Sequence, residues 1–563
     1  MIRIRKITAI LAATLMAFTT IACRQASAPS PEPTTSGGTD KLTSYYATLA
    51  TLQDVVSGLQ EDATIIMTGT VTASDIPTIS NIIYDYNSNT PQQHNITLNL
   101  KNVTGINSIP QQGFYNCYRL QSIILPDTVT SIGDYAFYQC SSLRNINIPD
   151  SVTTIGNYAF EYCYNLTTIN IPANVTSIGT NAFYSCNSLS KITVDSNNQY
   201  YCNDQYGVLF DKGKETLIKY PQPREGDYTI PNTVTTISDY AFHNCTNLTG
   251  ITIPTTVTSI GNYAFEFCNK LTAVVIPNNV TTINFGVFEY CPGLTSVTLP
   301  SSLQEIRSFA FNSCSKLPDI SIPTTVTHIA NSAFSGCKSF TTISIPASVI
   351  YIGDGAFNSC DALTAISVDS NNQKFINDES GVLYNKGKTT LMKCPDTKTG
   401  SYTIPTTVES IGNYAFYNCK GLTNITVPDS VTSIGNNAFA YCQGLTNLSI
   451  PGAITDIFSY TFYGCKGLTS FTIPDTVERI EDYVFYGCSG LTAITIPAAV
   501  TKIGCSTFWN CTNLTAITFT NTSNWKVTTD YNYTGGGSAE VTNPATNATN
   551  LKKTDNWYYW YKE

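Results

Sequence analysis

Cysteine has the widest chemical potential of the residues in this sequence, because a thiol can act as a nucleophile, bind a metal ion or form a disulfide. Fifteen of the 19 cysteines recur at intervals of 23 residues, interrupted by two gaps of 59. An exported chain with so many cysteines invites a disulfide framework. The strict period instead predicts one ladder of buried, free thiols, each able to reach a carbonyl of the neighbouring repeat. These ladder cysteines are Cys117, Cys140, Cys163, Cys186, Cys245, Cys268, Cys291, Cys314, Cys337, Cys360, Cys419, Cys442, Cys465, Cys488 and Cys511.

The other chemistry-bearing residues form no catalytic or metal-binding pattern in the sequence. His94, His243 and His328 are the only histidines, and none stands beside a serine, cysteine or carboxylate in a nucleophile-and-base arrangement. The sequence has no CxxC cluster, no glycine-rich phosphate loop and no recurring carboxylate pair. It therefore predicts no catalytic residue, no metal and no cofactor. A glycan-active enzyme is the least favoured alternative.

Aromatic residues follow the same period and indicate binding. A phenylalanine stands three residues before every ladder cysteine and is preceded by alanine or another small residue. The residue after it is aromatic in seven repeats: Tyr115, Tyr138, Tyr184, Tyr417, Tyr463, Tyr486 and Trp509. In three others it is Glu161, Glu266 or Glu289. Two residues before the phenylalanine stand further rings: Tyr135, Tyr158, Tyr240, Tyr263, Phe309, Tyr414, Tyr460 and Tyr483.

Tyrosine presents a large amphipathic area at low entropic cost and is enriched at recognition surfaces. The seven aromatic positions after the phenylalanine are therefore candidate binding residues. A second interpretation stays open, in which these rings only cover the corner between repeats and shield the phenylalanines.

The repeat that must position these residues reads LxxIxIPxxVxxIGxxAFxxC. Apolar residues such as Leu120 and Ile123 predict two short extended segments per coil, separated by Pro126, which lacks the N–H that a strand would use. Gly133 at the next corner is expected to take a positive φ. No stretch of the array keeps a 3.6-residue apolar period, so helices there should be single turns at most. One coil cannot close a core alone, and stacking must supply it, with the phenylalanines as a continuous column.

Two segments interrupt the period, at about 195–230 and 369–404, and the second copies the first at a constant offset of 174 residues. Cys202 and Cys394 fall in these insertions at non-equivalent places, which argues against a shared structural role. Cys505 also lies outside the ladder. The roles of these three cysteines stay open.

The repeat array is predicted over 98–520, with a cap at each end. Residues 44–97 lack the period and predict an α+β N-terminal cap, with helices around Ser44–Leu59 and Ser74–Asp85 and a strand at Thr64–Thr70. Residues 521–563 predict a C-terminal cap that ends in Trp557-Tyr-Tyr-Trp-Tyr561. This aromatic ending is interpreted as packing onto the last coil, with a ligand site as the alternative.

The N-terminus has the layout of an export signal. A basic start and an apolar run from Ile7 to Ala22 predict a signal peptide over residues 1–22. Thr20-Ile21-Ala22-Cys23 is similar to a bacterial lipobox, with Thr20 in place of the usual aliphatic residue, so Cys23 is a candidate lipid anchor. A plain secreted protein is the alternative. Residues 23–43 are rich in Pro, Ser, Thr and Gly and predict a flexible linker.

Composition limits the partners. Charged residues make up 12% of the chain and the formal net charge is −9, without a Lys/Arg cluster beyond the first six residues. Such a surface offers no footprint for a phosphate backbone, so no nucleic acid partner is expected.

The repeated motif resembles that of the BspA-like, or treponemal-type, leucine-rich-repeat family. The insertions are similar too: Asp195-Ser-Asn-Asn-Gln199 with Gly207-Val-Leu-Phe210, and Asp369-Ser-Asn-Asn-Gln373 with Gly381-Val-Leu-Tyr384. The resemblance implies a leucine-rich-repeat solenoid of 23-residue units, mainly β with short turns. It also implies a lipid-anchored or secreted bacterial surface protein that adheres to host matrix proteins, host cells or other bacteria. A protein or glycan ligand is expected, with a structural or decoy coat protein as the alternative.

Overall fold

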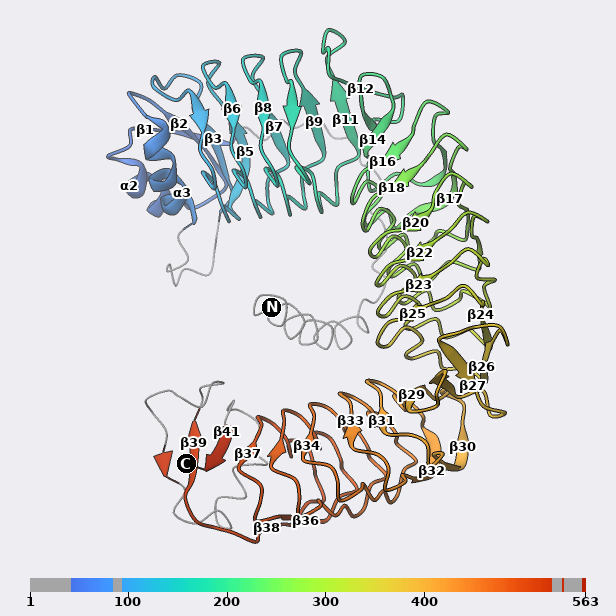
Figure 1. Ribbon diagram of the computed structural model, residues 1–563. Coiled ribbons are helices and arrows are strands. Elements are labelled where there is room, and N and C mark those ends of the chain that lie inside the picture. The colour runs from blue at the N-terminus through green and yellow to red at the C-terminus, as the bar shows by residue number, and fades with distance from the viewer. Residues whose placement is uncertain (1–41, 85–93, 529–538, 541–558, 563) are drawn as a thin grey trace, which may run out of the picture. The chain divides into compact units, whose positions relative to one another are not determined.

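The computed structural model describes residues 42–84, 94–528, 539–540 and 559–562. The predicted signal peptide, the candidate lipid anchor Cys23 and nearly all of the linker lie outside these residues. What is described is a β-solenoid in which successive coils stack and their strands run side by side (Figure 1). The predicted leucine-rich-repeat solenoid is therefore confirmed.

Most coils contribute one longer and one shorter strand to two parallel ladders, whereas the coils that follow Cys314, Cys442 and Cys465 lack the longer strand. Equivalent residues of neighbouring coils pair at the repeat offset, as Ile123 with Ile146 in the longer strands and Ile132 with Ile155 in the shorter ones. Pro126 follows the longer strand β5, as predicted. The longer strands are β3 (Ile96–Asn99), β5 (Leu120–Ile124), β7 (Asn145–Asn147), β9 (Thr168–Ile171), β11 (Lys191–Val194), β15 (Gly226–Thr229), β17 (Leu248–Thr252), β19 (Ala273–Val275), β21 (Ser296–Thr298), β24 (Thr342–Ile345), β26 (Ala365–Val368), β30 (Thr399–Thr403), β32 (Gly421–Thr426), β36 (Ala493–Ile496) and β38 (Ala516–Phe519).

The shorter strands form the second ladder. Each holds two residues, and the isoleucine of the pair faces the core because side chains alternate between the two faces of a strand. They are β4 (Ser108–Ile109), β6 (Ser131–Ile132), β8 (Thr154–Ile155), β10 (Ser177–Ile178), β16 (Thr236–Ile237), β18 (Ser259–Ile260), β20 (Thr282–Ile283), β22 (Glu305–Ile306), β23 (His328–Ile329), β25 (Tyr351–Ile352), β31 (Ser410–Ile411), β33 (Ser433–Ile434), β34 (Asp456–Ile457), β35 (Arg479–Ile480) and β37 (Lys502–Ile503).

The third side of each coil consists of turns and carries the phenylalanine and the cysteine. Positions there are named relative to the phenylalanine. In the Cys140 coil the backbone N–H groups of Tyr135 (Phe−2), Phe137 and Gln139 (Phe+2) donate to carbonyls of the next coil at 2.9, 2.8 and 2.7 Å. Tyr135 and Gln139 have φ values of 57° and 58°, and a positive φ recurs at Phe−2 and Phe+2 in every coil with a ladder cysteine. These left-handed residues turn alternate N–H groups toward the neighbouring coil.

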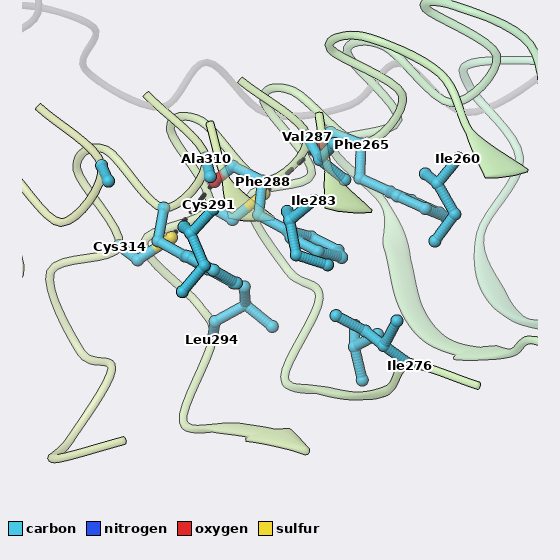
Figure 2. Packing of buried hydrophobic residues seen from close by; sticks show 14 of the residues in the cluster. Ile260, Phe265, Ile276, Ile283, Val287, Phe288, Cys291, Leu294, Ala310 and Cys314 are labelled. Atoms are coloured by element: carbon cyan, nitrogen blue, oxygen red, sulfur yellow. Dashed lines mark hydrogen bonds between the residues drawn. The ribbon is translucent and has the colours of Figure 1, made fainter. Parts of the chain in front are cut away.

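The phenylalanines stack as a column in the core, and the cysteines tie it together. In Figure 2, Phe265 and Phe288 lie face to face, with their ring centroids 5.4 Å apart and 8° between the planes. The Sγ of Cys291 donates to the carbonyl of Phe265 at 3.0 Å, and that of Cys314 to Phe288 at 3.1 Å. The prediction of buried free thiols is confirmed, because all fifteen ladder cysteines are free and buried.

The corner glycine has a different role from the one predicted. Gly133 does not have a positive φ, so that expectation was wrong. A Cβ on Gly133 would lie 2.6 Å from the backbone nitrogen of Gln111 in the preceding coil. The same corner carries an Asp or Asn whose side chain accepts from the next coil, as Asp134 Oδ1 does from the N–H of Asn157 at 2.7 Å. Glycine is needed there because two backbones approach too closely for a side chain.

The two insertions have the same construction. Each adds an antiparallel meander whose last strand joins the short-strand ladder, as β14 does beside β16 through Leu217 and Ile237. Tyr220 then takes the place of the column phenylalanine and stacks on Phe242 at 4.8 Å. Cys394 occupies that place in the second insertion, where its N–H donates to Ala415 as that of Tyr220 does to Ala241. The insertion strands are β12 (Tyr201–Asn203), β13 (Leu209–Asp211), β14 (Thr216–Lys219), β27 (Phe375–Asn377), β28 (Leu383–Asn385) and β29 (Thr390–Lys393).

The N-terminal segment packs helices against the first coil. Ser80 of helix α3 contacts Cys117, with 3.1 Å between Oγ and Sγ. The predicted helix over Ser44–Leu59 was wrong in its first half, which is strand β1, because residues 43–47 are Thr, Ser, Tyr, Tyr and Ala and β1 extends the sheet next to β2. The elements are β1 (Thr43–Ala47), α2 (Leu52–Ser57), β2 (Ala63–Met67), η1 (Ala73–Asp75) and α3 (Ile76–Tyr84).

At the other end, strand β41 (Tyr559–Lys562) pairs antiparallel with both β37 and β39 (Trp525–Thr528), and β40 (Ala539–Glu540) pairs with β39. Trp560 is 2% exposed, and its ring lies 6.1 Å from that of Phe519 in β38. This burial supports the interpretation of the aromatic ending as a cover for the last coil. Trp557 and Tyr558 lie outside the described residues.

The apolar core divides into three blocks at the insertions. The first runs from Ala47 to Ile192 and includes Leu209, the second from Val208 to Leu383, and the third from Val382 to Trp560. Within the described chain, no ring contact joins Phe183 to the next aromatic of the column. We call the junction between Phe183 and Phe242 the first seam and its copy between Phe357 and Phe416 the second seam.

Candidate functional site

The seven predicted binding residues all lie at Phe+1 on the turn side, where the structure divides them into two groups. Tyr115, Tyr138 and Tyr184 belong to a first aromatic cluster, and the other four belong to a second. Tyr115 is 38% exposed and Tyr463 only 8%, whereas the remaining five are half-buried. Most of these rings are therefore only partly open to solvent.

The first aromatic cluster is a continuous set of ring contacts. Tyr115 stacks on Tyr138 with centroids 4.7 Å apart, and contacts through Tyr162 lead on to Tyr184 at 5.6 Å. Tyr184 meets Tyr240 across the first seam at 4.7 Å. The cluster comprises Tyr115, Tyr135, Tyr138, Tyr158, Tyr162, Tyr164, Tyr184, Tyr240, His243, Tyr263, Phe267 and Tyr290.

The second aromatic cluster covers the coils between the second seam and the C-terminal end. Tyr463 stacks on Tyr486 at 4.6 Å, and Tyr486 meets Trp509 edge to face at 4.7 Å. The cluster comprises Tyr414, Tyr417, Tyr441, Tyr460, Tyr463, Tyr483, Tyr486 and Trp509.

Between the clusters, three coils carry small polar residues at the same positions. Their Phe+1 residues are Asn312, Ser335 and Asn358. The column phenylalanines nevertheless stack there as elsewhere, with Phe311 and Phe334 5.4 Å apart and 3° between their planes. Stacking of the coils therefore does not require an aromatic ring at Phe+1.

Sequence reasoning missed the aromatic residues at Phe+2, which bridge the other rings. Tyr162, Phe267, Tyr290 and Tyr441 occupy this position, and Phe267 stacks on Tyr290 at 4.8 Å. The signal was available in the sequence, because these residues keep the 23-residue period.

Buried carboxyl groups lie within the first aromatic cluster. Burial raises the pKa of Glu161 to about 7. Burial, and then repulsion from Glu266, raises the pKa of Glu289 to about 8. Burial, and then repulsion from Glu161, also raises the pKa of Tyr138 to about 12. Near neutral pH the tyrosine hydroxyls therefore stay protonated and can donate hydrogen bonds to a ligand.

A Ser–His–Glu chain crosses the first seam, and sequence reasoning missed it because the three residues are far apart in the chain. The Oγ of Ser185 lies 3.2 Å from Nε2 of His243, and Nδ1 of His243 lies 3.0 Å from Oε2 of Glu266. Burial lowers the pKa of His243, and Glu266 only partly opposes this. The order matches that of a nucleophile, a base and an orienting acid.

The surroundings of this chain fit a structural role. Ser185 and His243 are both buried and do not line the adjacent cavity. At the second seam, Tyr417 replaces His243 and bonds the equivalent Ser359. Because a tyrosine makes the same connection without a base, we interpret the chain as a polar tie across the seam.

Each seam also holds a cavity. The first, about 340 Å³, is lined by side chains that include Phe183, Tyr184, Lys219 and Tyr240. The second, about 110 Å³, is lined by the equivalent stretch around Phe357 and Lys393. These are places where regular stacking fails because the inserted meander displaces the next coil.

Metal-binding groups of three or more His, Cys, Asp or Glu do not occur within the parts of the chain that the structure describes. The three cysteines outside the ladder are free thiols there. Cys202 donates to the carbonyl of Asp211 at 3.2 Å, Cys394 stands in the phenylalanine column, and Cys505 donates its N–H to Asp482 at the corner of the neighbouring coil. Each fills a local structural position.

The sequence model of the BspA type leucine rich repeat region, with six copies of the repeat, matches residues 89–206, 226–317, 268–386 and 387–515. These matches cover most of the chain. The chain belongs to this family. Its repeats are the coils described above, and both aromatic clusters lie within the matched residues.

Solved structures of other leucine-rich-repeat proteins are similar to this family member. A leucine rich cell surface protein from Faecalibacterium prausnitzii is 33% identical over 66% of this chain and 84% of its own, with a TM-score of 0.44. A leucine-rich repeat protein from Eubacterium ventriosum is 28% identical over 57% of this chain and 94% of its own, with a TM-score of 0.43. The pneumococcal vaccine antigen PcpA is 19% identical over 59% of this chain and 78% of its own, with a TM-score of 0.37.

A search of curated proteins gives no significant match. Among the helices of the described segments, none has the length and apolar character needed to cross a membrane.

Proposed function

We propose that this BspA type protein is a surface adhesin, which uses its two aromatic clusters to bind a protein or glycan ligand on host or bacterial surfaces. The observation that carries the proposal is the row of coils between the clusters. Those coils stack their phenylalanines without rings at Phe+1, so the rings of the clusters are available for a task beyond stacking.

The clusters have the character of recognition surfaces. Stacked rings such as Tyr463 and Tyr486 are held by their neighbours, so a ligand does not have to pay for ordering them. Their hydroxyls remain protonated at neutral pH and can donate to a ligand's polar groups. Many modest contacts repeated along the coils would give specificity through their pattern.

The proposed location follows from the N-terminus and the family. Cys23 follows a lipobox-like stretch, and a lipid on it would anchor the protein to the bacterial envelope, with the linker extending the repeats outward. Protease shaving of intact cells tests this placement. We expect the wild-type repeats to be cleaved on the cell and a Cys23→Ser variant to be lost to the medium or retained inside.

The binding proposal is tested on arrays of host matrix proteins and glycans with the mature protein. Tyr115→Ser and Tyr486→Ser introduce a residue that Ser335 already provides at Phe+1, so the coils should still stack. We expect each variant to lower the affinity for a saturable ligand several-fold. Tyr351→Ser is the matched control, because Tyr351 is 46% exposed but lies in the short strand β25.

If no saturable ligand is found, or if all three variants bind like the wild type, the aromatic clusters are covers and the coat-protein alternative holds. If turnover of a glycan is found and is abolished by replacing one carboxylate, the protein is an enzyme and the proposal fails.

A further inference from the structure

The two seams can be compared residue by residue, because residues of the first recur in the second at an offset of 174. Lys219 and Lys393 are equivalent, each is the final residue of the last strand of its insertion, and each is 5% exposed. A buried ammonium group is costly unless an anion or several hydrogen bonds compensate it. The surroundings of the two lysines show how each seam meets this requirement.

The second seam compensates its lysine internally. Lys393 Nζ lies 2.6 Å from Oδ1 of Asp396 and donates to the carbonyl of Tyr417 at 3.1 Å. Asn418 donates to both Asp396 and Asp361, at 3.1 and 2.7 Å. Burial alone would lower the pKa of Lys393, but the attraction of Asp396 outweighs it and raises the pKa. This seam thus holds a complete charge pair.

The first seam has lost both carboxylates. Gln222 stands in the place of Asp396, and Asn187 in the place of Asp361. Lys219 Nζ donates to the carbonyl of Tyr240 at 3.2 Å, and within the described chain no carboxylate oxygen lies within 4.0 Å of it. Burial lowers the pKa of Lys219. An ammonium group has three donors, so this lysine has capacity left for an anion.

A second polar group at the first seam also lacks a partner. Gln222 is 2% exposed, and its Nε2 donates to the carbonyl of His243 at 2.8 Å. Its Oε1 is buried without a hydrogen-bond partner. Because this oxygen is an acceptor, it calls for a donor and does not itself select an anion. Asn358 at the second seam has an unpaired Oδ1 as well, so the difference between the seams lies in the lysine and the cavity.

The cavity at the first seam is about three times as large as its counterpart, at about 340 Å³ against about 110 Å³. Its walls are mainly apolar or aromatic: Ile178, Ala182, Phe183, Tyr184, Tyr201 and Ile218. Asp239 also lines it, but Oδ1 of Asp239 accepts from the N–H and Oδ2 from the Nδ2 of Asn262, so its charge is used within the corner ladder. Lys219 is the cation of the cavity.

We propose that the first seam binds a small organic carboxylate with an apolar or aromatic body, whose carboxylate reaches Lys219 from the cavity and accepts from its ammonium group, as Asp396 accepts from the lysine of the second seam. The cavity is within the size range of small-molecule sites, and its walls suit an apolar body. The inference goes beyond the proposed adhesion function, because it concerns a pocket between coils and not the outer ring surface.

The carboxylate can come from a free metabolite or from the end of a peptide, and both present the same chemistry. Phenylacetate serves as the free probe, and a short peptide ending in phenylalanine serves as the tethered one. Phenylacetamide and the amidated peptide are their neutral controls. Calorimetric titration of the full-length protein measures all four ligands.

The decisive variants exchange the seams. Gln222→Asp gives the lysine of the first seam the carboxylate partner that Asp396 provides in the second. The affinity for phenylacetate should fall by about tenfold or more, since the charged ligand would then meet a paired lysine and a second anion. Gln222→Asn alters the side chain without adding charge and should retain binding. Lys219→Met should abolish the preference for phenylacetate over phenylacetamide.

Tight binding of the peptide but not of phenylacetate would identify the ligand as the C-terminal carboxylate of a peptide, and the site would still be a carboxylate site. Equal affinity for phenylacetate and phenylacetamide would overturn the proposal, as would the absence of binding by either carboxylate at millimolar concentration. It would also be overturned if folded Gln222→Asp bound phenylacetate as well as Gln222→Asn does. Thermal melts of each variant verify folding, and because Gln222→Asp recreates a pair that the second seam accommodates, we expect it to fold.

Discussion

At the scale of single residues, the position after the column phenylalanine sets the local chemistry of a coil. Tyrosine there adds a ring to an aromatic cluster, serine or asparagine leaves a gap, and glutamate places an acid among rings. Glu289 is 8% exposed, and among the described residues its carboxyl group forms no ion pair with a basic side chain that would offset burial. Its raised pKa therefore makes the stability of the surrounding coils depend on pH.

For Glu289→Gln we expect the pH dependence to become flatter. The carboxyl group titrates near 4.5 in the unfolded chain and near 8 in the folded one, so between these values the folded state holds more protons. Its stabilising contribution is complete below pH 4.5 and is lost as the pH rises through 8, at up to about 1.4 kcal/mol per pH unit. Denaturant unfolding between pH 5 and 9 measures this slope in the wild type and in the variant.

Glu225→Gln, at an exposed position, provides the control and should leave the slope unchanged. An equal slope in Glu289→Gln and wild type would show that Glu289 titrates normally in the fold.

The residue scale also shows what the sequence could predict. The period of Cys291 was enough to predict a buried free thiol that reaches the neighbouring coil, because a repeated position must meet the same environment in every coil. The recurrence of glycine at the position of Gly133 predicted a corner, but it did not reveal why glycine is needed there. A left-handed backbone and a close backbone contact both demand glycine, and only coordinates separate them. The cross-seam contact of Ser185 with His243 had no sequence signal, since 58 residues separate the two.

At the scale of elements, each insertion is a meander whose entry is fixed to the solenoid by a buried asparagine. Asn198 is fully buried, and its Nδ2 donates to the carbonyls of Pro172 and Val175 at 2.7 and 3.0 Å. Its Oδ1 accepts from the N–H groups of Tyr200 and Tyr201, both at 2.8 Å. The recurring Asp-Ser-Asn-Asn-Gln motif therefore owes its fourth residue to this anchor.

For Asn198→Ala we expect a loss of about 3 kcal/mol or more, because two carbonyls and two N–H groups lose their partner and each buried orphan costs roughly 1–3 kcal/mol. The loss should be local to the first insertion. Hydrogen exchange should show faster exchange in β12 and β13 and unchanged rates around Phe114.

The neighbouring Asn197→Ala is the matched control, since Asn197 is exposed and should tolerate the change. Equal exchange in the two variants would mean that Asn198 does not anchor the meander.

Elements of the array were predictable because periodicity fixes them, whereas the N-terminal segment was not. Residues 44–59 include several good helix formers, and the sequence alone favours a helix. The sheet edge offered by β2 makes β1 a strand instead, which is a tertiary effect that local preference does not reveal.

At the scale of the whole molecule, the three core blocks should behave as cooperative units. Repeat proteins gain stability from each coil and from each interface with a neighbour, so a weak interface separates units that unfold independently. Both seams interrupt the phenylalanine column and the short-strand ladder, and they are crossed by side-chain contacts such as that of Asn418 with Asp361.

We therefore expect unfolding in more than one step, with boundaries at the insertions. Phe311→Ala should destabilise the middle block by about 3–5 kcal/mol, as for other buried aromatic truncations, while protection around Phe137 and Phe462 persists. Hydrogen exchange in increasing urea follows all three blocks at once. Simultaneous loss of protection throughout the chain would contradict this division.

The equivalence of the coils has an evolutionary consequence. The thiols of Cys268 and Cys442 donate to the equivalent phenylalanine carbonyls of their preceding coils, those of Phe242 and Phe416, at 3.3 and 3.1 Å. A gene that gains or loses a whole number of such coils by recombination therefore keeps the phenylalanine column and its thiol hydrogen bond at the new junction. The length of the solenoid and its set of variable side chains can therefore change during evolution without compensating substitutions in the core.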